Sequence, residues 1–404
     1  MRLCSVDLTN FRNYDRLQLA FPEGTHILYG ANAQGKTNLL EAIHLCASLR
    51  SHRTNRDEEL VRHDADFYRT DVAFKTDRGL DETLSVEYRL PASRGDSPSR
   101  IIRYNGLLID RLADMMGLFH AILFAPEDLQ IVKGGPVERR RFINHLISRT
   151  DRVYFRDLQD YGRIIGQRNR LLKRLKNDGA PGRDLAPMAA TELDVWDETL
   201  AQAASTLLEK RLAFVETLSE NAALSLHHLT ASRETLDIAY KGFPGLEDDM
   251  DRPAIYDAFL GRLRRSREDD IFRGNTSTGP HRDDLLISLN GVDARLYASQ
   301  GQQRSIVLAL KIAELILLRE ISGEKPILLL DDVMSELDQS RRARLLEVIA
   351  GHQVFITCTD PDQAVGTDAT HLCDIDWPGP IHFYRVHRGT VTPVDLPEAL
   401  SEPR

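Results

Sequence analysis

Gly30-Ala31-Asn32-Ala33-Gln34-Gly35-Lys36-Thr37 decides the fold of this chain. The stretch fits the pattern G-x-x-x-x-G-K-[ST], a loop that wraps around the phosphates of a nucleoside triphosphate. The glycines let backbone N–H groups face the β-phosphate, the Lys36 ammonium neutralises the β- and γ-oxygens, and the Thr37 hydroxyl completes the shell of a Mg²⁺ ion. We therefore predict a site for a magnesium nucleotide here.

The flanks of this loop support the prediction. Residues 25–29 form a short apolar run typical of a buried strand, and residues 38–49 carry Leu39, Leu40, Ile43 and Leu45 at helical spacing. A phosphate-binding loop of this type requires a strand before it and a helix after it. The alternative, a glycine turn that matches the pattern by chance, does not account for both flanks.

The composition is that of an ordinary globular protein. The chain has 404 residues, of which 42% are hydrophobic and 28% charged, and this length suggests two or three domains. The formal net charge of −9 argues against a protein that coats nucleic acid over its whole surface, so any contact with a phosphate backbone requires a local basic region.

Cysteine usage and hydropathy indicate the compartment. Cys4, Cys46, Cys358 and Cys373 are scattered without C-x-x-C spacing, which favours reduced thiols over disulfides or a zinc site. The first residues lack the apolar core of a signal peptide, and no later apolar run reaches membrane-spanning length without a charge. We expect a cytoplasmic location and no membrane partner.

Periodicity divides the chain into three parts. Strand patterns are found early, a helical pattern dense in arginine runs from Val137 to about Leu229, and strands alternate with helices again from Leu285. We expect strands at 3–8, 17–21, 25–29, 71–74, 83–90, 101–104, 285–289, 327–330, 354–357, 381–386 and 389–391, and helices at 38–49, 302–319 and 340–349.

The helical part is expected to form two antiparallel arms. Breakers at 177–183 mark an exposed tip between them, and the apolar stripe of the second arm, which includes Leu193, Trp196 and Leu200, is interpreted as packing surface. We predict an α/β fold in which residues 1–125 and 272–404 form one nucleotide-binding domain and residues 126–271 form an inserted, basic α-helical arm domain.

A second chemical motif follows the apolar run 326–330. A carboxylate at the carboxyl end of a buried strand can hold Mg²⁺ or its water, and the next carboxylate can orient or deprotonate the attacking water. We assign these roles to Asp331 and Asp332. Two acids in this position can also merely cap the next helix, and it is the pairing with the phosphate loop that favours the catalytic interpretation.

The order of the motifs resembles the ATP-binding-cassette ATPases, in particular their SMC and Rad50-like branch. After the phosphate loop come Ser299-Gln300-Gly301-Gln302 at a helix start, then the acid-terminated strand and Ser335-Glu336-Leu337-Asp338. Within this branch the chain is similar to the RecF family of recombination and gap-repair ATPases over nearly its full length. The matching segments are 8–14, 30–38, 124–129, 134–141, 278–284, 299–304 and 330–338.

The resemblance implies an ABC-type ATPase head that binds ATP with Mg²⁺, dimerises with the nucleotide between two subunits and hydrolyses it slowly on DNA. It also implies work at gaps and single-strand/double-strand junctions, with RecR and RecO, in loading RecA. The nucleotide would then contact the loop from Gly30 to Asn38 and, from the other subunit, Ser299, Gly301 and Gln302, with catalysis by Lys36, Asp331 and Asp332 and metal binding by Thr37 and Asp331.

Three positions depart from the wider cassette pattern. Gln300 replaces the first glycine of the signature motif, and Asp332 is one methylene shorter than the usual glutamate, which is consistent with slow hydrolysis. For the γ-phosphate contact after the last strand we consider Thr359 in place of histidine. The metal-facing glutamine of relatives has no clear equivalent, and Glu127, Asp128 and Gln130 all remain candidates.

Basic residues concentrate on the first arm. Arginines along a helix can neutralise phosphates without reading bases, which predicts salt-sensitive binding selective for DNA structure. The candidate DNA contacts are Arg139, Arg140, Arg141, Arg152, Arg156, Arg163 and Arg170, within a cluster that also contains Arg149, Arg168, Lys173, Arg174 and Lys176 and that Arg50, His52, Arg53 and Arg56 could extend. A solvated charged face or ion pairs between subunits is the alternative.

Two other functions stay open at this stage. One is a cassette subunit that powers a membrane transporter, against which the arginine-rich arm and the first residues argue. The other is a scaffold that binds ATP and DNA without productive hydrolysis. The segment 278–284 is interpreted as architectural, and His145, His227 and His228 form no recognisable metal site.

Overall fold

The computed structural model describes residues 1–91, 93, 97–179, 186–231, 234–359 and 379–395. Its strands are β1 (Arg2–Phe11), β2 (Tyr14–Ala20), β3 (Thr25–Tyr29), β4 (Phe67–Lys75), β5 (Asp81–Arg89), β6 (Ser99–Tyr104), β7 (Leu107–Leu108), β8 (Ala121–Phe124), β9 (Leu236–Lys241), β10 (Asp284–Leu289), β11 (Val292–Asp293), β12 (Ile327–Asp331), β13 (Val354–Cys358), β14 (Ile381–His387) and β15 (Thr390–Val394).

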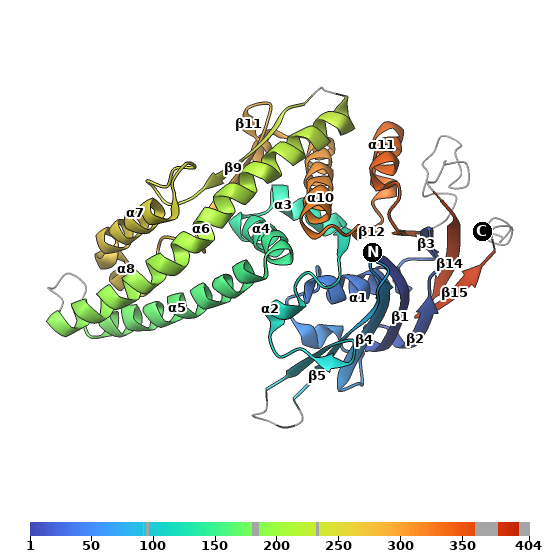
Figure 1. Cartoon of the computed structure of the whole chain (residues 1–404), viewed down its shortest axis with the longest axis horizontal. Coiled ribbons are helices and arrows are strands. Elements are labelled where there is room, and N and C mark those ends of the chain that lie inside the picture. The colour runs from blue at the N-terminus through green and yellow to red at the C-terminus, as the bar shows by residue number, and fades with distance from the viewer. Residues whose placement is uncertain (92, 94–96, 180–185, 232–233, 360–378, 396–404) are drawn as a thin grey trace. The chain divides into compact units, whose positions relative to one another are not determined.

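The helices are α1 (Lys36–Ser48), α2 (Leu112–Met115), α3 (Gln130–Lys133), α4 (Pro136–Thr150), α5 (Arg152–Asn177), α6 (Pro187–Thr230), α7 (Arg252–Arg265), α8 (Arg267–Arg273), α9 (Ala294–Tyr297), α10 (Gln300–Ser322) and α11 (Gln339–Ile349) (Figure 1). Every strand and helix expected from the sequence is present, with ends shifted by a few residues. Part of the expected arm tip, together with Cys373, lies outside the described residues.

The chain divides into two compact units. The first comprises Met1–Leu129, Ser225–Arg233 and Val307–Arg404, and the second comprises Gln130–Leu224 and Glu234–Ile306. The boundaries differ from those predicted, because residues 272–306 group with the second unit. The reason is strand pairing: β10 pairs antiparallel with β9 from Asp284↔Lys241 to Leu289↔Leu236, which ties this stretch to the end of the helical insertion.

The first unit contains two six-stranded sheets. One is antiparallel, in the order β2-β1-β4-β5-β6-β7. The other, in the order β15-β14-β3-β13-β12-β8, is parallel except for the edge strand β15, which pairs antiparallel with β14. Helix α1 contacts strands of both sheets. It is accordingly apolar on nearly all sides, with Leu39, Leu40, Ile43 and Leu45 fully buried, as a helix between two sheets must be.

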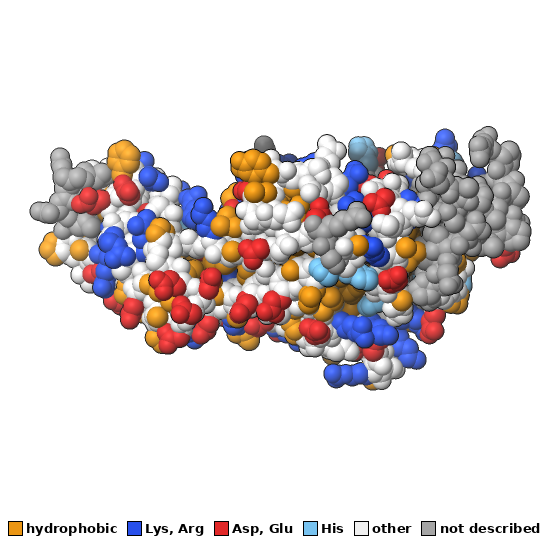
Figure 2. Space-filling model, turned by 90° about the horizontal axis from the view of Figure 1, so that it is seen from above, with side chains coloured by type: hydrophobic (Ala, Val, Ile, Leu, Met, Phe, Trp, Pro, Cys, Tyr) orange, Lys and Arg blue, Asp and Glu red, His pale blue; other side chains and the backbone are white. Residues whose placement is uncertain are grey.

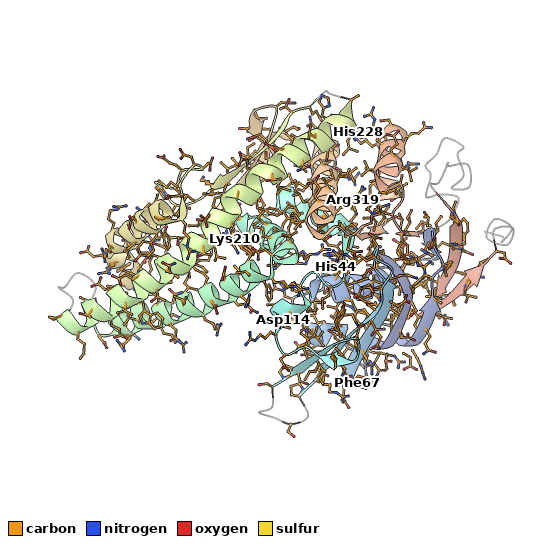
Figure 3. All side chains as sticks on the ribbon, in the orientation of Figure 1. His44, Phe67, Asp114, Lys210, His228 and Arg319 are labelled. Carbon is orange, nitrogen blue, oxygen red and sulfur yellow. The ribbon has the colours of Figure 1, made fainter. Side chains whose placement is uncertain are left out.

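The second unit is built around two long helices. Leu193 near the start of α6 packs with Leu171, Leu172 and Leu175 near the end of α5, and Lys210, further along α6, pairs with Asp151, the N-cap of α5, at 2.7 Å (Figure 3). Contacts between the start of one helix and the end of the other make α5 and α6 antiparallel, as predicted. Within the described residues, no helix is both long and apolar enough to cross a lipid bilayer.

Candidate nucleotide-binding site

The strand order of the parallel sheet brings the two predicted motifs to one edge. The phosphate loop follows β3, Asp331 and Asp332 follow Leu330 in β12, and β13 lies between the two strands. Because β3, β13 and β12 are parallel, their carboxyl ends share that edge, which is where ligands bind in open α/β sheets.

The loop holds its shape through glycine and its own lysine. Gly35 has φ +122°, and a Cβ there would lie 2.8 Å from the Asn13 amide and 2.9 Å from the Tyr14 hydroxyl, so a larger residue does not fit. The buried Lys36 ammonium donates to the carbonyl oxygens of Gly30 and, at 2.9 Å, Ala31. Burial lowers the pKa of Lys36, and Cys358, Asp332 and Asp331 partly offset that shift.

Two turns from elsewhere in the first unit brace the loop. The Asn13 amide donates to the carbonyl oxygen of Gln34 (2.9 Å), and the Tyr14 hydroxyl donates to that of Gly35 (2.9 Å). From the β14–β15 turn, the backbone N–H of Arg388 donates to the Gln34 side chain (2.8 Å). The loop is therefore preorganised, while Ala31, Asn32 and Ala33 stay exposed.

Asp331 is the centre of the acidic end of the site. It is 6% exposed, and its Oδ1 accepts hydrogen bonds from the Thr37 hydroxyl (2.9 Å) and the Thr357 hydroxyl (2.7 Å). Burial raises the pKa of Asp331 because it disfavours the charged form, and the two hydroxyls oppose that shift. The side chains of Thr37 and Asp331, the two residues predicted to hold one cation, are thus in direct contact.

The next residue, Asp332, is exposed and lies beside Asp331 and Thr357. Its backbone adopts φ 54°, a left-handed conformation that is uncommon outside glycine. The Thr357 hydroxyl accepts from its backbone N–H (3.0 Å), and the Ser335 hydroxyl donates to its Oδ1 (2.9 Å). These contacts fix the direction of the Asp332 carboxylate, and the same Thr357 hydroxyl connects both acids.

Thr357 is a site residue that sequence reasoning missed. The sequence did show that Thr357 lies near the end of a predicted strand. Only the strand order, however, places the end of that strand between Lys36 and the two acids. Thr359, the residue we considered there, is exposed. Of the candidates for the metal-facing position, Asp128 accepts from the backbone N–H of Ala125 (2.9 Å), so its carboxylate already caps the turn that follows β8.

Further polar residues support the helix that follows the loop. The Asn38 amide donates to Asn13 (2.8 Å) and accepts from Arg53 (2.9 Å). One turn on, the fully buried Glu41 binds Arg12 through two hydrogen bonds of 2.8 and 2.9 Å. Burial alone would raise the pKa of Glu41, but hydrogen bonds from Arg12 and Ser51 hold it below its usual range.

The predicted signature motif opens α10 in the second unit. Ser299 and Gln302 form a capping box: the N–H of Gln302 donates to the Ser299 hydroxyl (3.3 Å) and the N–H of Ser299 donates to the Gln302 side chain (2.8 Å). The Gln302 amide also donates to Glu234 (2.9 Å). Ser299 is exposed and Gly301 partly so, whereas the Gln302 side chain is committed to the cap.

The structure corrects the predicted row of DNA-binding arginines. Arg139 is 5% exposed and pairs with Asp284 through bonds of 2.7 and 2.8 Å, Arg149 is buried, and Arg168 is fully buried between Asp197 and Asp270. Arg140 is half-buried and donates to the carbonyl oxygen of Asp283 (2.6 Å). Arg139 and Arg168 are therefore internal ion pairs, which a helical pattern alone does not distinguish from a solvated face.

The other basic residues of the first arm lie at the surface. Those that remain as candidates are Arg141, Arg152, Arg156, Arg163, Arg170, Lys173, Arg174 and Lys176. Three of them have acidic neighbours on the arm: Arg141 pairs with Glu138, Arg163 with Asp160 and Arg174 with Glu192. These ion pairs make the basic character of the arm local rather than continuous. Acidic and basic side chains are also interspersed on the face drawn in Figure 2.

Segment 278–284 is tied into the second unit by buried polar contacts. Arg211, 1% exposed, donates to the carbonyl oxygen of Pro280 (2.8 Å) and to the Tyr240 hydroxyl (2.8 Å), which donates to Asp283 (2.7 Å). The Nδ1 atom of His281 accepts from Tyr161 (2.7 Å), while Nε2 faces the carbonyl oxygen of Thr276 (3.1 Å). These contacts support the architectural interpretation.

The largely enclosed His281 makes stability depend on pH. Burial lowers its pKa from 6.5 to about 4, so below pH 6.5 the unfolded chain takes up a proton that the folded chain does not. We expect His281 to cost up to about 3 kcal/mol of folding free energy as the pH falls from 6.5 to 4. Urea unfolding across this range should show a shallower decline in His281→Gln than in wild type, with the exposed His63→Gln as control. Parallel curves for all three proteins would contradict this role.

Comparison with known proteins adds the family context. The sequence model of the RecF/RecN/SMC N-terminal domain matches residues 2–373. Proteins named DNA replication and repair protein RecF are similar throughout: that of Symbiobacterium thermophilum is 41% identical over 394 residues, 97% of this chain and 98% of its own length. That of Lachnoclostridium phytofermentans is 38% identical over 388 residues, 96% of this chain and 98% of its own.

Solved structures agree. A structure described as the recombination mediator protein RecF-ATP in the RecFOR pathway matches with a TM-score of 0.85 and 33% identity, covering 98% of both chains. The Smc head domain of Pyrococcus furiosus matches with a TM-score of 0.52 and 16% identity over 99% of this chain and 98% of its own. The latter likeness concerns the fold alone, which is the predicted ATPase head of mixed sheets flanked by helices.

Proposed function

The chain belongs to the RecF family of DNA replication and repair proteins, and from this premise we propose that it is a cytoplasmic, ATP-dependent DNA-binding protein of recombinational repair. The observation that carries the proposal is the meeting of Lys36, Thr37, Asp331 and Asp332 at one edge of the parallel sheet. That constellation is the chemistry of a hydrolysable magnesium nucleotide rather than of a metabolite pocket.

The donor set fits magnesium. A hydroxyl and a carboxylate in direct contact, Thr37 and Asp331, supply the hard oxygen ligands that Mg²⁺ prefers. The bound ion would screen the charge of the β- and γ-phosphates. Lys36 then binds the same phosphates, and the Asn13 and Tyr14 contacts keep the loop amides in place to receive them.

Asp332 is proposed to orient and deprotonate the attacking water. Its carboxylate is exposed, as a group that must reach a water requires, and is aimed by Ser335. Its short side chain limits its reach, which is consistent with slow hydrolysis. A protein that holds DNA as long as ATP is bound, here called a clamp, requires slow hydrolysis rather than rapid turnover.

ATP is proposed to join two copies of the chain. Ser299 and the first turns of the long helix α10 belong to the second unit, while the phosphate loop belongs to the first. Helix-start amides facing the γ-phosphate of a partner's nucleotide would complete a symmetric pair of sites. Loss of the γ-phosphate removes the contact that favours the closed dimer, so hydrolysis leads to release.

The DNA ligand proposed is gapped DNA or a single-strand/double-strand junction, where the protein would act with RecO and RecR in loading RecA. Exposed arginines of α5 such as Arg156 and Arg170 can meet backbone phosphates. The RecFOR pathway named for the solved relative supports this assignment. We retain one alternative, a scaffold that binds ATP and DNA without productive hydrolysis.

DNA binding should require ATP and fall steeply with salt. On a gapped duplex, the slope of log affinity against log salt should be about −0.9 for each neutralised phosphate. Arg156→Gln combined with Arg170→Gln should reduce that slope by about 2, because two phosphate contacts are lost. Fluorescence anisotropy with and without ATP measures both effects. Binding that ignores both salt and ATP would refute the proposed clamp.

Hydrolysis should depend on Asp332. We expect Asp332→Asn to reduce the single-turnover rate of ATP hydrolysis on DNA by about a hundredfold, the typical contribution of a positioned general base. Asparagine tolerates the left-handed backbone at this position, so the loop should keep its shape. Glu336→Gln, which neutralises another carboxylate of the same turn, is the matched control. Equal rates in wild type and Asp332→Asn would favour the scaffold.

A further inference from the structure

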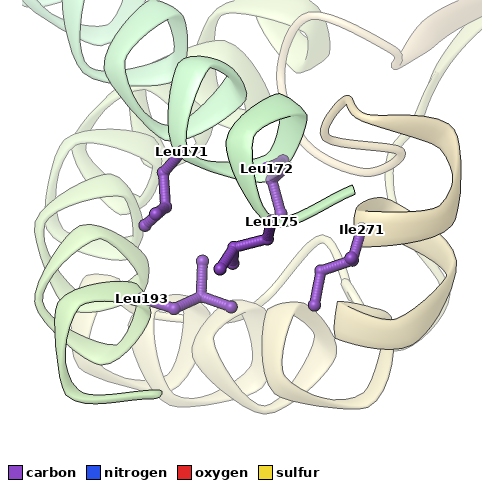
Figure 4. Close-up of a cluster of buried hydrophobic side chains, with 5 residues drawn as sticks. All are labelled: Leu171, Leu172, Leu175, Leu193 and Ile271. Carbon is purple, nitrogen blue, oxygen red and sulfur yellow. The ribbon is translucent and has the colours of Figure 1, made fainter. Parts of the chain in front are cut away.

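The end of α8 is fixed against the long helices of the second unit. Ile271 packs into a buried apolar cluster with Leu171, Leu172 and Leu175 of α5 and Leu193 of α6 (Figure 4). The next residue, Phe272, is 67% exposed, and Arg273 is exposed as well. Burial of Ile271 therefore presents a large aromatic ring and a guanidinium on a surface whose backbone is held in place.

Two lysines of α5 lie beside the same helix end. Gly274 caps α8 in a left-handed conformation, φ 71°, and a Cβ added there would lie 3.3 Å from Cγ of Lys173 and 3.5 Å from Cδ of Lys176. The stems of both lysines thus flank the residue that follows Arg273. Both lysines are exposed, so the exposed Phe272 and Arg273 precede, in sequence, the glycine at which two exposed lysines of α5 meet the end of α8.

Few acidic side chains lie near the positive charges of Lys173, Lys176 and Arg273. Among the described residues, Lys173, Lys176 and Arg273 form no ion pair, in contrast to the neighbouring Arg174, which is paired with Glu192. The closest acids in sequence are Asp178 after α5 and Glu268, Asp269 and Asp270 in the first turn of α8, the end opposite to Gly274. Asp270 is buried and already paired with Arg168 at 2.8 Å. An anion can therefore approach the C-terminal end of α8 without meeting a carboxylate from that end of the helix.

We propose that Phe272, Lys173, Lys176 and Arg273 form a binding site for unpaired nucleic acid, in which one base stacks on the Phe272 ring and the three cations neutralise the adjoining phosphates. An exposed apolar residue alone means little. An exposed ring combined with nearby basic side chains on the same helix end, however, supplies the two elements with which proteins bind single strands without reading sequence, a stacking surface and phosphate-neutralising charge. The site rests on the proposed function and deepens it, because it gives the protein a contact with the unpaired side of a junction.

The test compares two oligonucleotides on the full-length protein with ATP present. The probes are a fluorescein-labelled 20-nucleotide thymidine strand and a blunt duplex of the same length. We expect Phe272→Ala to weaken single-strand binding by about tenfold, the effect of losing one stacked base, and to leave duplex binding unchanged. Phe272→Trp should retain single-strand affinity. Leu224→Ala, which removes an equally exposed apolar side chain from α6, is the matched control.

The cations are tested through salt dependence. Changing Lys173, Lys176 and Arg273 together to Gln should reduce the salt slope of single-strand binding by about 2, at about 0.7 per phosphate, whereas Lys241→Gln, on the exposed end of β9, should change it by less than 1. The proposal is overturned if Phe272→Ala matches Leu224→Ala, or if it weakens both probes equally. Failure of the wild-type protein to bind any DNA would instead refute the proposed function itself.

Discussion

Lys36→Ala is expected to abolish ATP binding, with a loss of affinity of a hundredfold or more. In the proposed site the ammonium would donate charge-assisted hydrogen bonds to two phosphate oxygens. Each such bond contributes about 1.5 kcal/mol or more, and about 1.4 kcal/mol corresponds to a tenfold change in affinity. Lys36 is the one lysine of the pattern G-x-x-x-x-G-K-[ST] at residues 30–37. Isothermal titration with a slowly hydrolysed ATP analogue measures the effect directly.

The control for Lys36→Ala separates binding from folding. The Lys36 ammonium also donates to the loop carbonyls of Gly30 and Ala31, so thermal unfolding should be measured alongside. Lys325→Ala removes an exposed lysine of the same unit and should bind the analogue like wild type. A folded Lys36→Ala protein with wild-type affinity would show that the nucleotide binds elsewhere.

Ser299→Arg is expected to leave ATP binding by the single chain intact and to prevent ATP-driven dimerisation. In the proposed dimer the Ser299 side chain faces the partner's γ-phosphate, and an arginine side chain is too large for such a contact. Because the phosphate loop belongs to the other unit, the variant should bind ATP with unchanged affinity. Sedimentation velocity with and without ATP distinguishes the monomer from the dimer.

The Ser299 experiment needs a control for the helix cap. Ser299 forms a capping box with Gln302, and loss of an N-cap costs about 1 kcal/mol. Ser299→Ala removes the cap without adding bulk and should still dimerise, though at higher protein concentration. Dimerisation of Ser299→Arg with ATP would remove Ser299 from the proposed interface.

The site could be predicted from the sequence where its parts are local. The loop Gly30–Thr37 and the acids Asp331 and Asp332 each carry their own flanking pattern, because a strand must deliver them to an edge. Both Thr37 and Asp331 were predicted as ligands of one Mg²⁺, and their side chains lie 2.9 Å apart; the metal-binding role itself stays a prediction. Thr357 could not be predicted in the same way, since its role depends on β13 lying between β3 and β12, and strand order is a long-range property.

The errors in the basic arm have a similar cause. Arg139 and Arg168 fit a charged helical face, yet their partners Asp284 and Asp270 come more than a hundred residues later. Only the folded chain shows that these charges are neutralised inside the second unit. Strand β9 and helices α7 and α8 were likewise not predicted, and it is the end of α8, at Gly274, that lies beside the lysines of α5.

The central claim is that each ATP is held by Lys36 of one copy and Ser299 of another. Mixing Lys36→Ala with Ser299→Arg tests it, because a mixed dimer has one intact composite site, whereas wild type mixed with the double variant Lys36→Ala/Ser299→Arg gives mixed dimers with none. Subunits labelled for energy transfer report only mixed dimers. Our account predicts ATP-dependent energy transfer in the first mixture and none in the second, and equal transfer in the two mixtures would contradict it.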